Sequence, residues 1–319
     1  MSVKNKTIFM TGGSGFIGSA LAGLLVEHNK VIIYDNCRRF SPVLENLLKH
    51  KNLTFIKGDV LDLKRLKKSI PKKIDIVIHL AAIAGVSSYY EMPVSTMVTN
   101  ILGAHNVLSL VSEKPIKRFL NFSTSEVYAT HADRLKEEDE TIQGRINERR
   151  WTYSLSKLAA EKLAYCYYWE KKLPFVSIRP FNIYGPGQIG EGAIQIFITK
   201  ALKNDSLHVT GKGNQVRAWC YIDDLTQAVF KCFTNEKAAG NVFNIGNEKT
   251  AMKTIDLARM VVSLSGSKSK ICFKPHIGVD IDLRVPNIDK AKRLLGYAPK
   301  VSLKEGLLKT IKWQKEFVQ

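Results

Sequence analysis

Residues 11–18 read Thr-Gly-Gly-Ser-Gly-Phe-Ile-Gly, and they lie between a short apolar run, residues 7–10, and a segment with the apolar spacing of a helix, residues 19–28. Three glycines recur at every third position: Gly12, Gly15 and Gly18. A glycine-rich turn between a buried strand and a helix lets the backbone approach a pyrophosphate, whose charge then lies at the helix N-terminus. The turn therefore predicts a dinucleotide-binding site, with a spacing shifted from the usual fingerprint.

A second strand-like run supports this prediction. Residues 31–34 are apolar and lead to Asp35, whose carboxylate is placed to accept hydrogen bonds from the hydroxyls of an adenosine ribose. An acid at this place also repels a 2′-phosphate, so the sequence favours NAD over NADP. Arg38 and Arg39, which follow, leave NADP open as the alternative.

Apolar strand-like runs alternate with helical segments along the first part of the chain. They cover residues 53–57, 74–80, 119–123 and 175–178. This alternation predicts an α/β fold with a doubly wound parallel sheet of the Rossmann type. Ligands of such sheets bind at the C-terminal ends of the strands, where Asp59, Ala81 and Ala82 are found. Asp59 is a candidate to accept from the adenine amino group or, alternatively, a helix N-cap, and the two alanines are small enough for a cofactor to lie against the backbone.

The character of the chain changes after residue 182, where glycine-rich turns and shorter elements replace the regular alternation. We expect an NAD-binding Rossmann domain in residues 1–182, with segments after residue 215 returning to it. A smaller C-terminal substrate-binding lobe is expected mainly in residues 183–319. Near the end, residues 303–317 have a stripe of Leu, Ile and Trp and are predicted to form a structural helix.

A candidate acid/base pair lies at residues 151–157, Trp-Thr-Tyr-Ser-Leu-Ser-Lys, which place Tyr153 and Lys157 four residues apart at the start of a predicted helix. Side chains four residues apart share one face of a helix, and a nearby ammonium lowers the pKa of a phenol by favouring the phenolate. The pair therefore suggests acid/base chemistry on an alcohol. Taken alone, the pattern is also a common accident of helical sequence.

The composition limits the kind of protein. With 45% hydrophobic and 24% charged residues, the chain resembles an ordinary globular protein. Its five cysteines are scattered singly, which argues against a zinc site or a disulfide framework, so no metal is expected. We find no run of about 18 uncharged apolar residues and no features of a signal peptide, and we therefore expect a cytoplasmic protein without a membrane partner.

The net charge of +19 arises from 48 basic and 29 acidic side chains. Such an excess is found in proteins that bind nucleic acid or membrane surfaces. However, the densest basic cluster, residues 64–73, contains no stacking aromatics, and we interpret it as the solvated face of a short helix and its loop. We therefore expect no nucleic-acid partner and an added attraction for anionic substrates.

Two helical segments, residues 94–111 and 151–171, are candidates for a subunit interface. The second is rich in aromatic residues: Tyr153, Tyr165, Tyr167, Tyr168 and Trp169. Because one core needs fewer aromatics than this, we expect a homodimer built from these two helices. A plain buried helix is the alternative interpretation.

Further motifs follow one another over nearly the whole chain. They are Thr-Gly-Gly-x-Gly-Phe-Ile-Gly at 11–18, Asp35, Gly58-Asp59-Val60, Leu80-Ala81-Ala82, Asn100, Ser-Thr-Ser-Glu-Val-Tyr at 123–128, Tyr153 with Lys157, Arg-Pro-Phe-Asn at 179–182, Gln215 with Arg217, and Tyr-Ile-Asp-Asp at 221–224. In this order they resemble the extended short-chain dehydrogenase/reductase family, the NAD-dependent nucleotide-sugar epimerases, dehydratases and decarboxylases. The resemblance implies NAD as the cofactor and a nucleotide-diphosphate sugar as the substrate.

The resemblance also implies roles for individual residues. Tyr153 would take the proton of the sugar 4-hydroxyl while hydride leaves C4 for the nicotinamide, with Lys157 holding the nicotinamide ribose and Thr124 bonded to the same sugar oxygen. The implied cofactor-binding residues are Gly12, Gly15, Phe16, Ile17, Gly18, Asp35, Asn36, Asp59, Val60, Leu80, Ala81, Ala82, Asn100, Ser123, Tyr153 and Lys157. The implied substrate-binding residues are Thr124, Asn182, Arg217 and Arg284, with Leu207, His208 and Val209 beside the base.

The 4-ketone formed in this way has three fates in the family: loss of carbon dioxide from C6, loss of water across C5 and C6, or reduction on the other face. Glu126 is a carboxylate able to work at C5, which counts against a simple epimerase. The pair Ser125-Glu126 and the late Arg284 resemble the UDP-glucuronate decarboxylases, in which the arginine is placed to act on the carboxylate or C5. Many dehydratases instead carry Asp-Glu, although GDP-mannose dehydratases also have Thr-Ser-Glu.

We therefore expect a UDP-glucuronate decarboxylase with catalytic residues Thr124, Ser125, Glu126, Tyr153, Lys157 and Arg284. A 4,6-dehydratase and a 4-epimerase are the alternatives within the family. A catalytically silent regulator that binds NAD or a nucleotide sugar is an alternative of another class. The complete set of Thr124, Tyr153 and Lys157 argues against it, since a binding module has no need of a proton acceptor.

Overall fold

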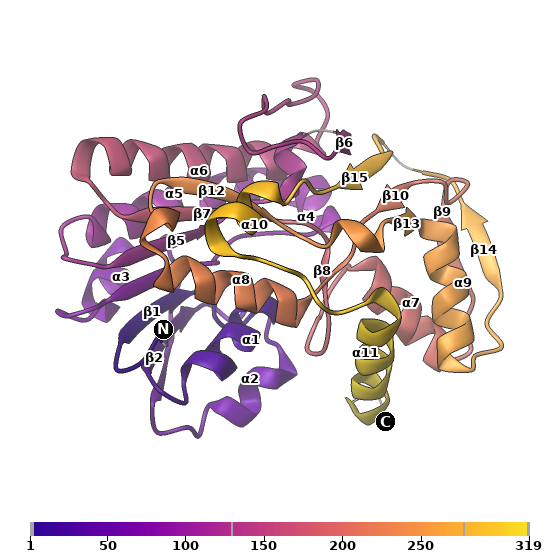
Figure 1. Cartoon of the computed structure of the whole chain (residues 1–319), viewed down its shortest axis with the longest axis horizontal. Coiled ribbons are helices and arrows are strands. Elements are labelled where there is room, and N and C mark those ends of the chain that lie inside the picture. Colours follow the sequence, from indigo (N-terminus) through magenta and orange to yellow (C-terminus); the bar gives the residue numbers. More distant parts are fainter. Residues whose placement is uncertain (1–2, 129, 277, 318–319) are drawn as a thin grey trace.

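The computed structural model describes residues 3–128, 130–276 and 278–317. Its centre is a seven-stranded sheet in which all neighbouring strands run parallel (Figure 1). The strands are β1 (Thr7–Thr11), β2 (Lys30–Asp35), β3 (Leu53–Lys57), β4 (Ile76–His79), β5 (Arg118–Phe122), β7 (Phe175–Pro180) and β12 (Asn241–Ile245). Their order, β12-β7-β5-β4-β1-β2-β3, reverses beside β1, so a ligand crevice forms at the C-terminal ends of β1 and β4. The predicted doubly wound Rossmann sheet is confirmed.

Helices follow most of the strands. They are α1 (Phe16–Leu25), α2 (Pro42–Leu47), α3 (Leu63–Ser69), α4 (Val86–Glu91), α5 (Pro93–Val111), α6 (Trp151–Lys171), α7 (Ala193–Leu202), α8 (Ile222–Thr234), α9 (Thr254–Ser265), α10 (Asp289–Leu295) and α11 (Leu303–Phe317). The helices predicted around residues 94–111, 151–171 and 303–317 are confirmed as α5, α6 and α11. The helix predicted at residues 19–28 instead begins at Phe16 and ends at Leu25, because the glycine turn is complete at the N-cap Gly15.

Helices cover both faces of the sheet, and its strands are therefore buried on both sides. On β1, Ile8 and Met10 belong to one cluster of buried apolar side chains, whereas Phe9 belongs to another. This separation follows from the alternation of side chains along a strand. Residues of α1 and α8 pack in the first cluster, and residues of α3, α5 and α6 pack in the second.

Several elements from the second half of the chain build a smaller lobe beside the sheet (Figure 1). Its strands and the remaining short elements are β8 (Ile183–Tyr184), β9 (Leu207–Thr210), β10 (Val216–Arg217), β11 (Cys220–Tyr221), β13 (Met252–Lys253), β14 (Ile271–Lys274), β15 (Leu283–Val285), β6 (His131–Asp133) and the 3₁₀ turns η1 (Ser125–Tyr128), η2 (Glu236–Ala238) and η3 (Glu248–Thr250). β6 pairs with β15 of the lobe, and α8 and β12 return to the main sheet. The domain boundary at residue 182 stays a prediction.

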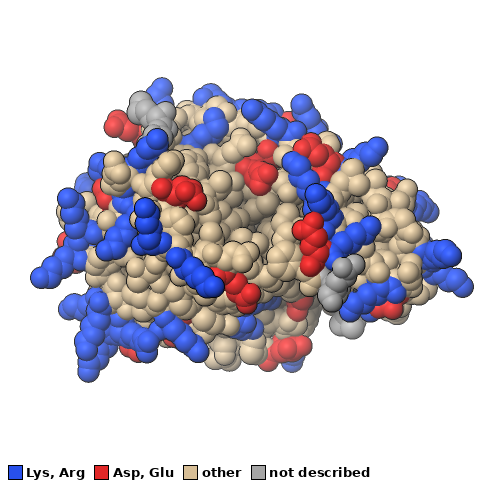
Figure 2. Space-filling view, turned by 90° about the horizontal axis from the view of Figure 1, so that it is seen from below, with Lys and Arg blue, Asp and Glu red and all other residues tan. Residues whose placement is uncertain are grey.

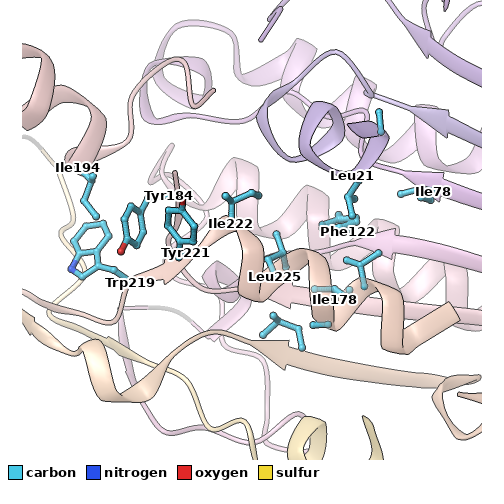
Figure 3. Close-up of a cluster of buried hydrophobic side chains, with 14 of the residues drawn as sticks. Leu21, Ile78, Phe122, Ile178, Tyr184, Ile194, Trp219, Tyr221, Ile222 and Leu225 are labelled. Carbon is cyan, nitrogen blue, oxygen red and sulfur yellow. The ribbon is translucent and has the colours of Figure 1, made fainter. Parts of the chain in front are cut away.

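One continuous cluster of buried apolar side chains joins the sheet to the lobe (Figure 3). Ile78 on β4 and Leu225 on α8 fill the layer next to the sheet. The same cluster continues through Tyr184 and Trp219 into the lobe. Since protein interiors are close-packed, this shared core holds the lobe in a fixed place beside the edge of the sheet.

α5 is the one helix among the described residues with the length and mean hydropathy of a membrane span. It packs along α6, and 39% of its most apolar window is buried in the fold. Core helices of globular proteins meet the same criteria. We therefore interpret α5 as part of the α/β fold.

Charged side chains are spread over the surface. Figure 2 shows lysine and arginine side chains around the rim of the face viewed from below Figure 1, with a hollow near its middle. Side chains of both signs border this hollow (Figure 2). The basic excess is therefore widely distributed on this face, as expected for solvated lysines.

We predict that Leu225→Ala lowers the free energy of unfolding by about 2–5 kcal/mol, because it leaves a cavity in the shared core. Leu225 is fully buried, whereas Leu308 on α11 is 44% exposed. Leu308→Ala is the matched control and should change stability by less than about 1 kcal/mol. Urea denaturation followed by circular dichroism measures both. Equal losses in the two variants would contradict the continuous core.

Candidate active site

A first cavity opens at the C-terminal ends of β1, β2 and β4. Most of the predicted cofactor residues line it: Gly12, Gly15, Phe16, Ile17, Gly18, Asp35, Asn36, Val60, Leu80, Ala81, Ala82, Ser123, Tyr153 and Lys157. These residues come from six different segments of the chain, and the parallel direction of the strands brings them together. This arrangement is the crevice in which doubly wound sheets bind a dinucleotide.

The glycine turn brings the backbone into close contact with the neighbouring strand. Gly12 has φ +74°, and a Cβ atom there would lie 2.6 Å from the carbonyl carbon of Leu80. A Cβ atom at Gly18 would lie 2.6 Å from the carbonyl oxygen of Gly12. Only glycine fits both places, and the resulting cradle ends at the N-terminus of α1, whose free N–H groups favour an anion. The cradle therefore fits the pyrophosphate of NAD.

Asp35 is held at the end of β2 by two backbone groups. Its Oδ2 accepts from Ser14 N at 3.0 Å, and its Oδ1 accepts from Cys37 N at 2.7 Å. Each carboxylate oxygen keeps further lone pairs for ligand hydroxyls. The geometry thus supports the predicted contact with the adenosine ribose.

Asp59 does not line the cavity, but it supports a residue that does. Its Oδ2 accepts from Asn36 Nδ2 at 2.9 Å, and its Oδ1 accepts from Leu61 N at 2.9 Å. The alternative role as a helix N-cap is wrong, because Asp62 caps α3 by accepting from Arg65 N. Asp59 therefore orients Asn36 at the edge of the adenine end of the cavity.

Asn100 lies behind the cavity wall rather than in it. Its Oδ1 accepts from Ile83 N at 2.7 Å, and its Nδ2 donates to Ile83 O and to Ser156 Oγ. The side chain is 1% exposed, so its hydrogen-bonding groups serve the protein itself. Asn100 holds residue 83, which lines the cavity, against α6.

Tyr153 and Lys157 lie side by side on α6, as the four-residue spacing predicted. Tyr153 lines both the first cavity and a second one, while Lys157 lines the first. Thr124 is hydrogen-bonded to the Tyr153 hydroxyl. The tyrosine is therefore placed where a cofactor and a substrate meet.

The predicted lowering of the Tyr153 pKa by Lys157 is not observed. Burial raises the pKa of Tyr153, the charge of Glu126 raises it further, and the hydrogen bond from Thr124 lowers it. Burial also lowers the pKa of Lys157, to about 8. The reason is that a low-dielectric site disfavours both charged forms, which sequence spacing does not reveal.

The second cavity adjoins the first and contains the predicted catalytic and substrate residues. It is lined by Thr124, Ser125, Glu126, Tyr153, Asn182, Arg217 and Arg284. Arg39, considered from the sequence only for the choice of cofactor, lines it as well, together with residues that received no role from the sequence: Tyr89, Arg150, Gln188 and Glu191. Arg39, Gln188 and Tyr153 line both cavities. The shared wall makes the two cavities one continuous site.

Arginines dominate the electrostatics of the second cavity. Arg150 Nη2 lies 3.8 Å from Glu126 Oε2, and Arg150 Nη1 donates to the Tyr89 hydroxyl at 3.2 Å. Burial lowers the pKa of Arg284 and of Arg217, each to about 10, although nearby carboxylates oppose this effect. The guanidiniums remain charged at neutral pH, and their geometry suits phosphate and carboxylate.

The predicted contacts of residues 207–209 with the base are not seen in either cavity. Leu207 and Val209 are fully buried in the main apolar cluster, and only His208 is exposed. Alternation along β9 explains this result, since two of the three side chains must face the core. The side chains of Leu207 and Val209 are therefore unavailable to a ligand.

Among the missed residues, Arg150 had a signal in the sequence. It directly precedes Trp151, the first residue of the catalytic helix, and a residue at this place lies near the active-site end of α6. Tyr89 and Glu191 had no such signal. Glu191 Oε2 accepts from Ser87 N at 3.0 Å, and this tertiary contact brings the loop after β8 to α4.

No metal-binding group of His, Cys, Asp or Glu is present in the described part of the chain.

Together, the fold and the site define an enzyme that binds NAD at the edge of a Rossmann sheet and an anionic substrate beside it. The sequence profile of the NAD dependent epimerase/dehydratase family matches residues 8–246. The chain belongs to this family, and it is an enzyme of nucleotide-sugar metabolism. The resemblance drawn from the motifs is thus confirmed.

Relatives with different reactions are similarly close. The chain is 35% identical to UDP-N-acetyl-alpha-D-glucosaminuronate decarboxylase of Bacillus cytotoxicus, with 98% of each chain covered. It is 36% identical to dTDP-D-glucose 4,6-dehydratase of Dictyostelium discoideum, over 82% of this chain and 62% of the relative. The structure of UDP-glucuronic acid 4-epimerase from Bacillus cereus with UDP-glucuronic acid and NAD superposes with a TM-score of 0.89 at 29% identity, covering 98% of this chain and 99% of the other.

We predict that Gly12→Ala weakens NAD binding by at least roughly tenfold, because its Cβ would collide with the backbone of the neighbouring strand. Gly266→Ala is the matched control: Gly266 has a similar φ of +69°, but nothing lies within 4 Å of its Cβ position. The control should lose about 1 kcal/mol of stability through strain alone and keep its NAD affinity. Isothermal titration with NAD measures the difference. Equal affinities in the two variants would refute the cradle.

Proposed function

We propose that the protein decarboxylates a UDP-linked uronic acid of the UDP-glucuronate class. The observation that carries this proposal is that Ser125, Glu126 and Arg284 line the second cavity together. Four arginines line this cavity against the carboxylates of Glu126 and Glu191, and the diphosphate of a nucleotide sugar balances the resulting excess of two positive charges. The choice of a uronic acid therefore depends on Ser125 and on Arg284, whose guanidinium suits a sugar carboxylate.

The position of Tyr153 and Thr124 supports the first step. Tyr153 accepts the proton of the sugar 4-hydroxyl as its phenolate, which the hydrogen bond from Thr124 and the charge of Arg39 favour against the effect of burial. The residues of the first cavity would hold NAD, which when bound would supply the hydride acceptor for C4. The ammonium of Lys157 lines the cofactor cavity, where it is placed to bind the nicotinamide ribose.

The second step needs a site that stabilises an enolate. With a ketone at C4, the C6 carboxylate belongs to a β-keto acid; the bond between C5 and C6 breaks, carbon dioxide leaves, and the electron pair remains as an enolate on O4. Tyr153, protonated in the first step, and Thr124 donate to this oxygen. A proton from water then adds at C5, and the hydride removed from C4 in the first step would be returned to reduce the ketone.

Ser125 favours decarboxylation over dehydration. Loss of water from C6 is assisted by an acid that protonates the departing hydroxyl, and a serine hydroxyl is too weak an acid for this role. Ser125 is buried in the wall of the cavity next to Glu126. The 4,6-dehydratase of Dictyostelium discoideum keeps dehydration as the second candidate, with Glu126 removing the C5 proton.

The test is incubation with UDP-glucuronate, UDP-N-acetylglucosaminuronate, UDP-glucose and dTDP-glucose, followed by mass analysis. We expect a uronic acid to lose the mass of carbon dioxide. Loss of the mass of water would show dehydration instead, and an unchanged mass with inverted C4 would show epimerisation; either result would contradict the proposal.

Tyr153→Phe should bind NAD normally but turn over at least about a hundredfold more slowly, because the proton acceptor is gone. Unchanged turnover in this variant would refute the mechanism.

We also propose that two copies of the chain pair through α5 and α6. The outer face of α5 carries three apolar side chains at four-residue intervals, Val94, Val98 and Leu102, which are 74%, 37% and 49% exposed. On α6, Trp169 is 52% exposed. An apolar stripe on a packed helix pair is suited to a second copy of itself, which forms a four-helix interface around a two-fold axis.

Leu102→Glu should convert the dimer to a monomer, since it places a charge in the centre of the proposed interface. Leu24→Glu is the matched control, because Leu24 is 51% exposed on α1, outside the interface. Size-exclusion chromatography with light scattering measures the mass of each variant. A dimer that persists in Leu102→Glu, or a wild-type monomer, would refute this interface.

A further inference from the structure

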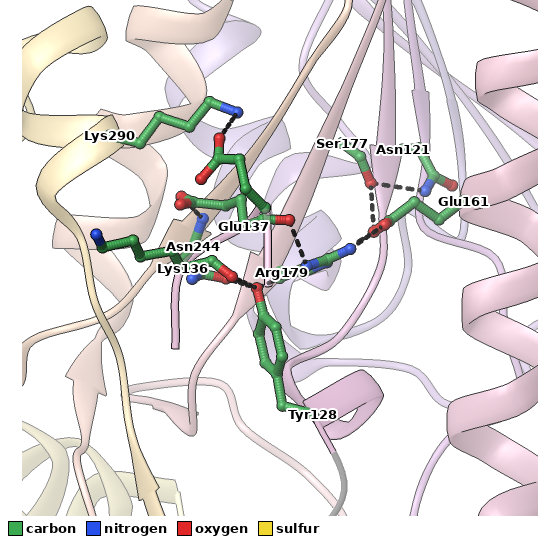
Figure 4. A network of polar contacts seen from close by, with 10 residues as sticks. Asn121, Tyr128, Lys136, Glu137, Glu161, Ser177, Arg179, Asn244 and Lys290 are labelled. Atoms are coloured by element: carbon green, nitrogen blue, oxygen red, sulfur yellow. Dashed lines mark hydrogen bonds and ion pairs between the residues drawn. The ribbon is translucent and has the colours of Figure 1, made fainter. Parts of the chain in front are cut away.

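A buried polar network connects the catalytic helix to the rest of the active site (Figure 4). Its centre is Arg179 on β7, which forms a two-point ion pair with Glu161 on α6. Arg179 Nη2 lies 2.6 Å from Glu161 Oε1, and Arg179 Nε donates to Glu161 Oε2 at 3.2 Å. Both side chains are at most 5% exposed.

One side of the network ties α6 to the central sheet. Ser177 Oγ on β7 donates to Glu161 Oε2 at 3.1 Å, and Asn121 Nδ2 on β5 donates to Ser177 Oγ at 3.0 Å (Figure 4). β5 leads directly into Ser123 and Thr124. The Glu161 carboxylate is therefore anchored to the same strand that delivers Thr124 to the site.

The other side of the network ends on the turn that carries Glu126. Arg179 Nη1 donates to the Tyr128 hydroxyl at 2.6 Å, and the guanidinium also lies over the Tyr128 ring at 4.9 Å. Tyr128 is the last residue of η1, the turn that contains Ser125 and Glu126. Its hydroxyl also donates to Asn244 Oδ1 on β12 at 3.0 Å, which fixes the turn from a second direction.

Glu161 also occupies a particular place on α6. Tyr153, Lys157 and Glu161 follow one another at four-residue intervals, so they share one face of the helix. The charge of Glu161 raises the pKa of Lys157 and partly offsets the effect of burial. The other titratable groups near Lys157 are Tyr153 on the same helix and His79 on β4, whose pKa burial lowers to about 3, so His79 is neutral.

We propose that Glu161 is a positioning residue of this active site: through Arg179 it fixes α6 against the segments that carry Thr124 and Glu126, and its carboxylate shares the face of α6 that carries the Lys157 ammonium. The network costs desolvation of two buried charges, and an apolar pair of similar size would hold the helix without that cost. A positioning role accounts for its retention, because Tyr153 and Glu126 come from different elements and must meet across one cavity. The proposal rests on the proposed role of Tyr153 and Lys157 in oxidation at C4.

The first test reads the protonation of Lys157 without any substrate. Lys157 lines the cofactor cavity but is only 3% exposed, so the reagent must be a small acylating agent, and only the neutral amine reacts. The extent of acetylation of the peptide with residue 157, followed by mass spectrometry from pH 6 to 11, should rise with a midpoint near the Lys157 pKa of about 8. The exposed Lys162 on the same helix serves as an internal reference.

Glu161→Gln keeps the size of the side chain and removes its charge. We expect the Lys157 midpoint to fall by about one pH unit or more, since a nearby opposite charge is lost. Glu161→Asp keeps the negative charge, so the Lys157 midpoint should return most of the way to its wild-type value. A merely structural role gives the opposite result: loosening of α6 would let water reach Lys157 and raise its midpoint toward the ordinary lysine range. A raised or unchanged midpoint overturns the proposal.

Tyr128→Phe tests the second half of the proposal. It removes the hydroxyl between Arg179 and η1 but leaves the Glu161 charge, so the Lys157 midpoint should stay constant while kcat falls about tenfold or more at an unchanged NAD affinity. Wild-type kcat in this variant would overturn the link to Glu126. Because acetylation needs neither substrate nor NAD, a protein that turned over none of the nucleotide sugars would contradict the proposed function and leave the Lys157 result readable.

Discussion

The common direction of the strands is the constraint on which the rest of this structure depends. Because β1, β4, β5 and β7 are parallel, their C-terminal ends meet at one edge and bring together the glycine turn, Thr124 and Asn182. The lobe then closes this edge from outside through a continuous apolar core. Tyr153 is reached from both sides, so the cofactor and the substrate are held against a single hydroxyl group.

Charge separates the work of the two cavities. The cofactor cavity is lined by glycines, alanines and other apolar residues, and its charged residues are Asp35, Arg38, Arg39 and Lys157. The substrate cavity is rich in arginines. The proposed choice of decarboxylation over dehydration and epimerisation rests on Ser125, Glu126 and Arg284 in this cavity.

Much of the fold and part of the site could be predicted from the sequence, because they depend on local patterns. The glycine turn, the end of β2 at Asp35 and the bounds of α6 are set by neighbouring residues. The features that could not be predicted depend on burial in the folded protein. Burial raises the pKa of Tyr153, and the side chains of Leu207 and Val209 face the core. The pairing of Glu161 with Arg179 was equally hidden, since only the packing of α6 on β7 brings them together.

The pairing of β15 with β6 has a consequence for exchanging parts of the chain with those of a related enzyme. Arg284, in the substrate lobe, lies in register with Ala132, which belongs to the segment just after the Glu126 turn. The lobe is therefore not built from the C-terminal half alone, because its four-stranded sheet includes β6 from the first half of the chain. Exchange of the C-terminal half alone would transfer Arg284 without the strand that pairs with its own.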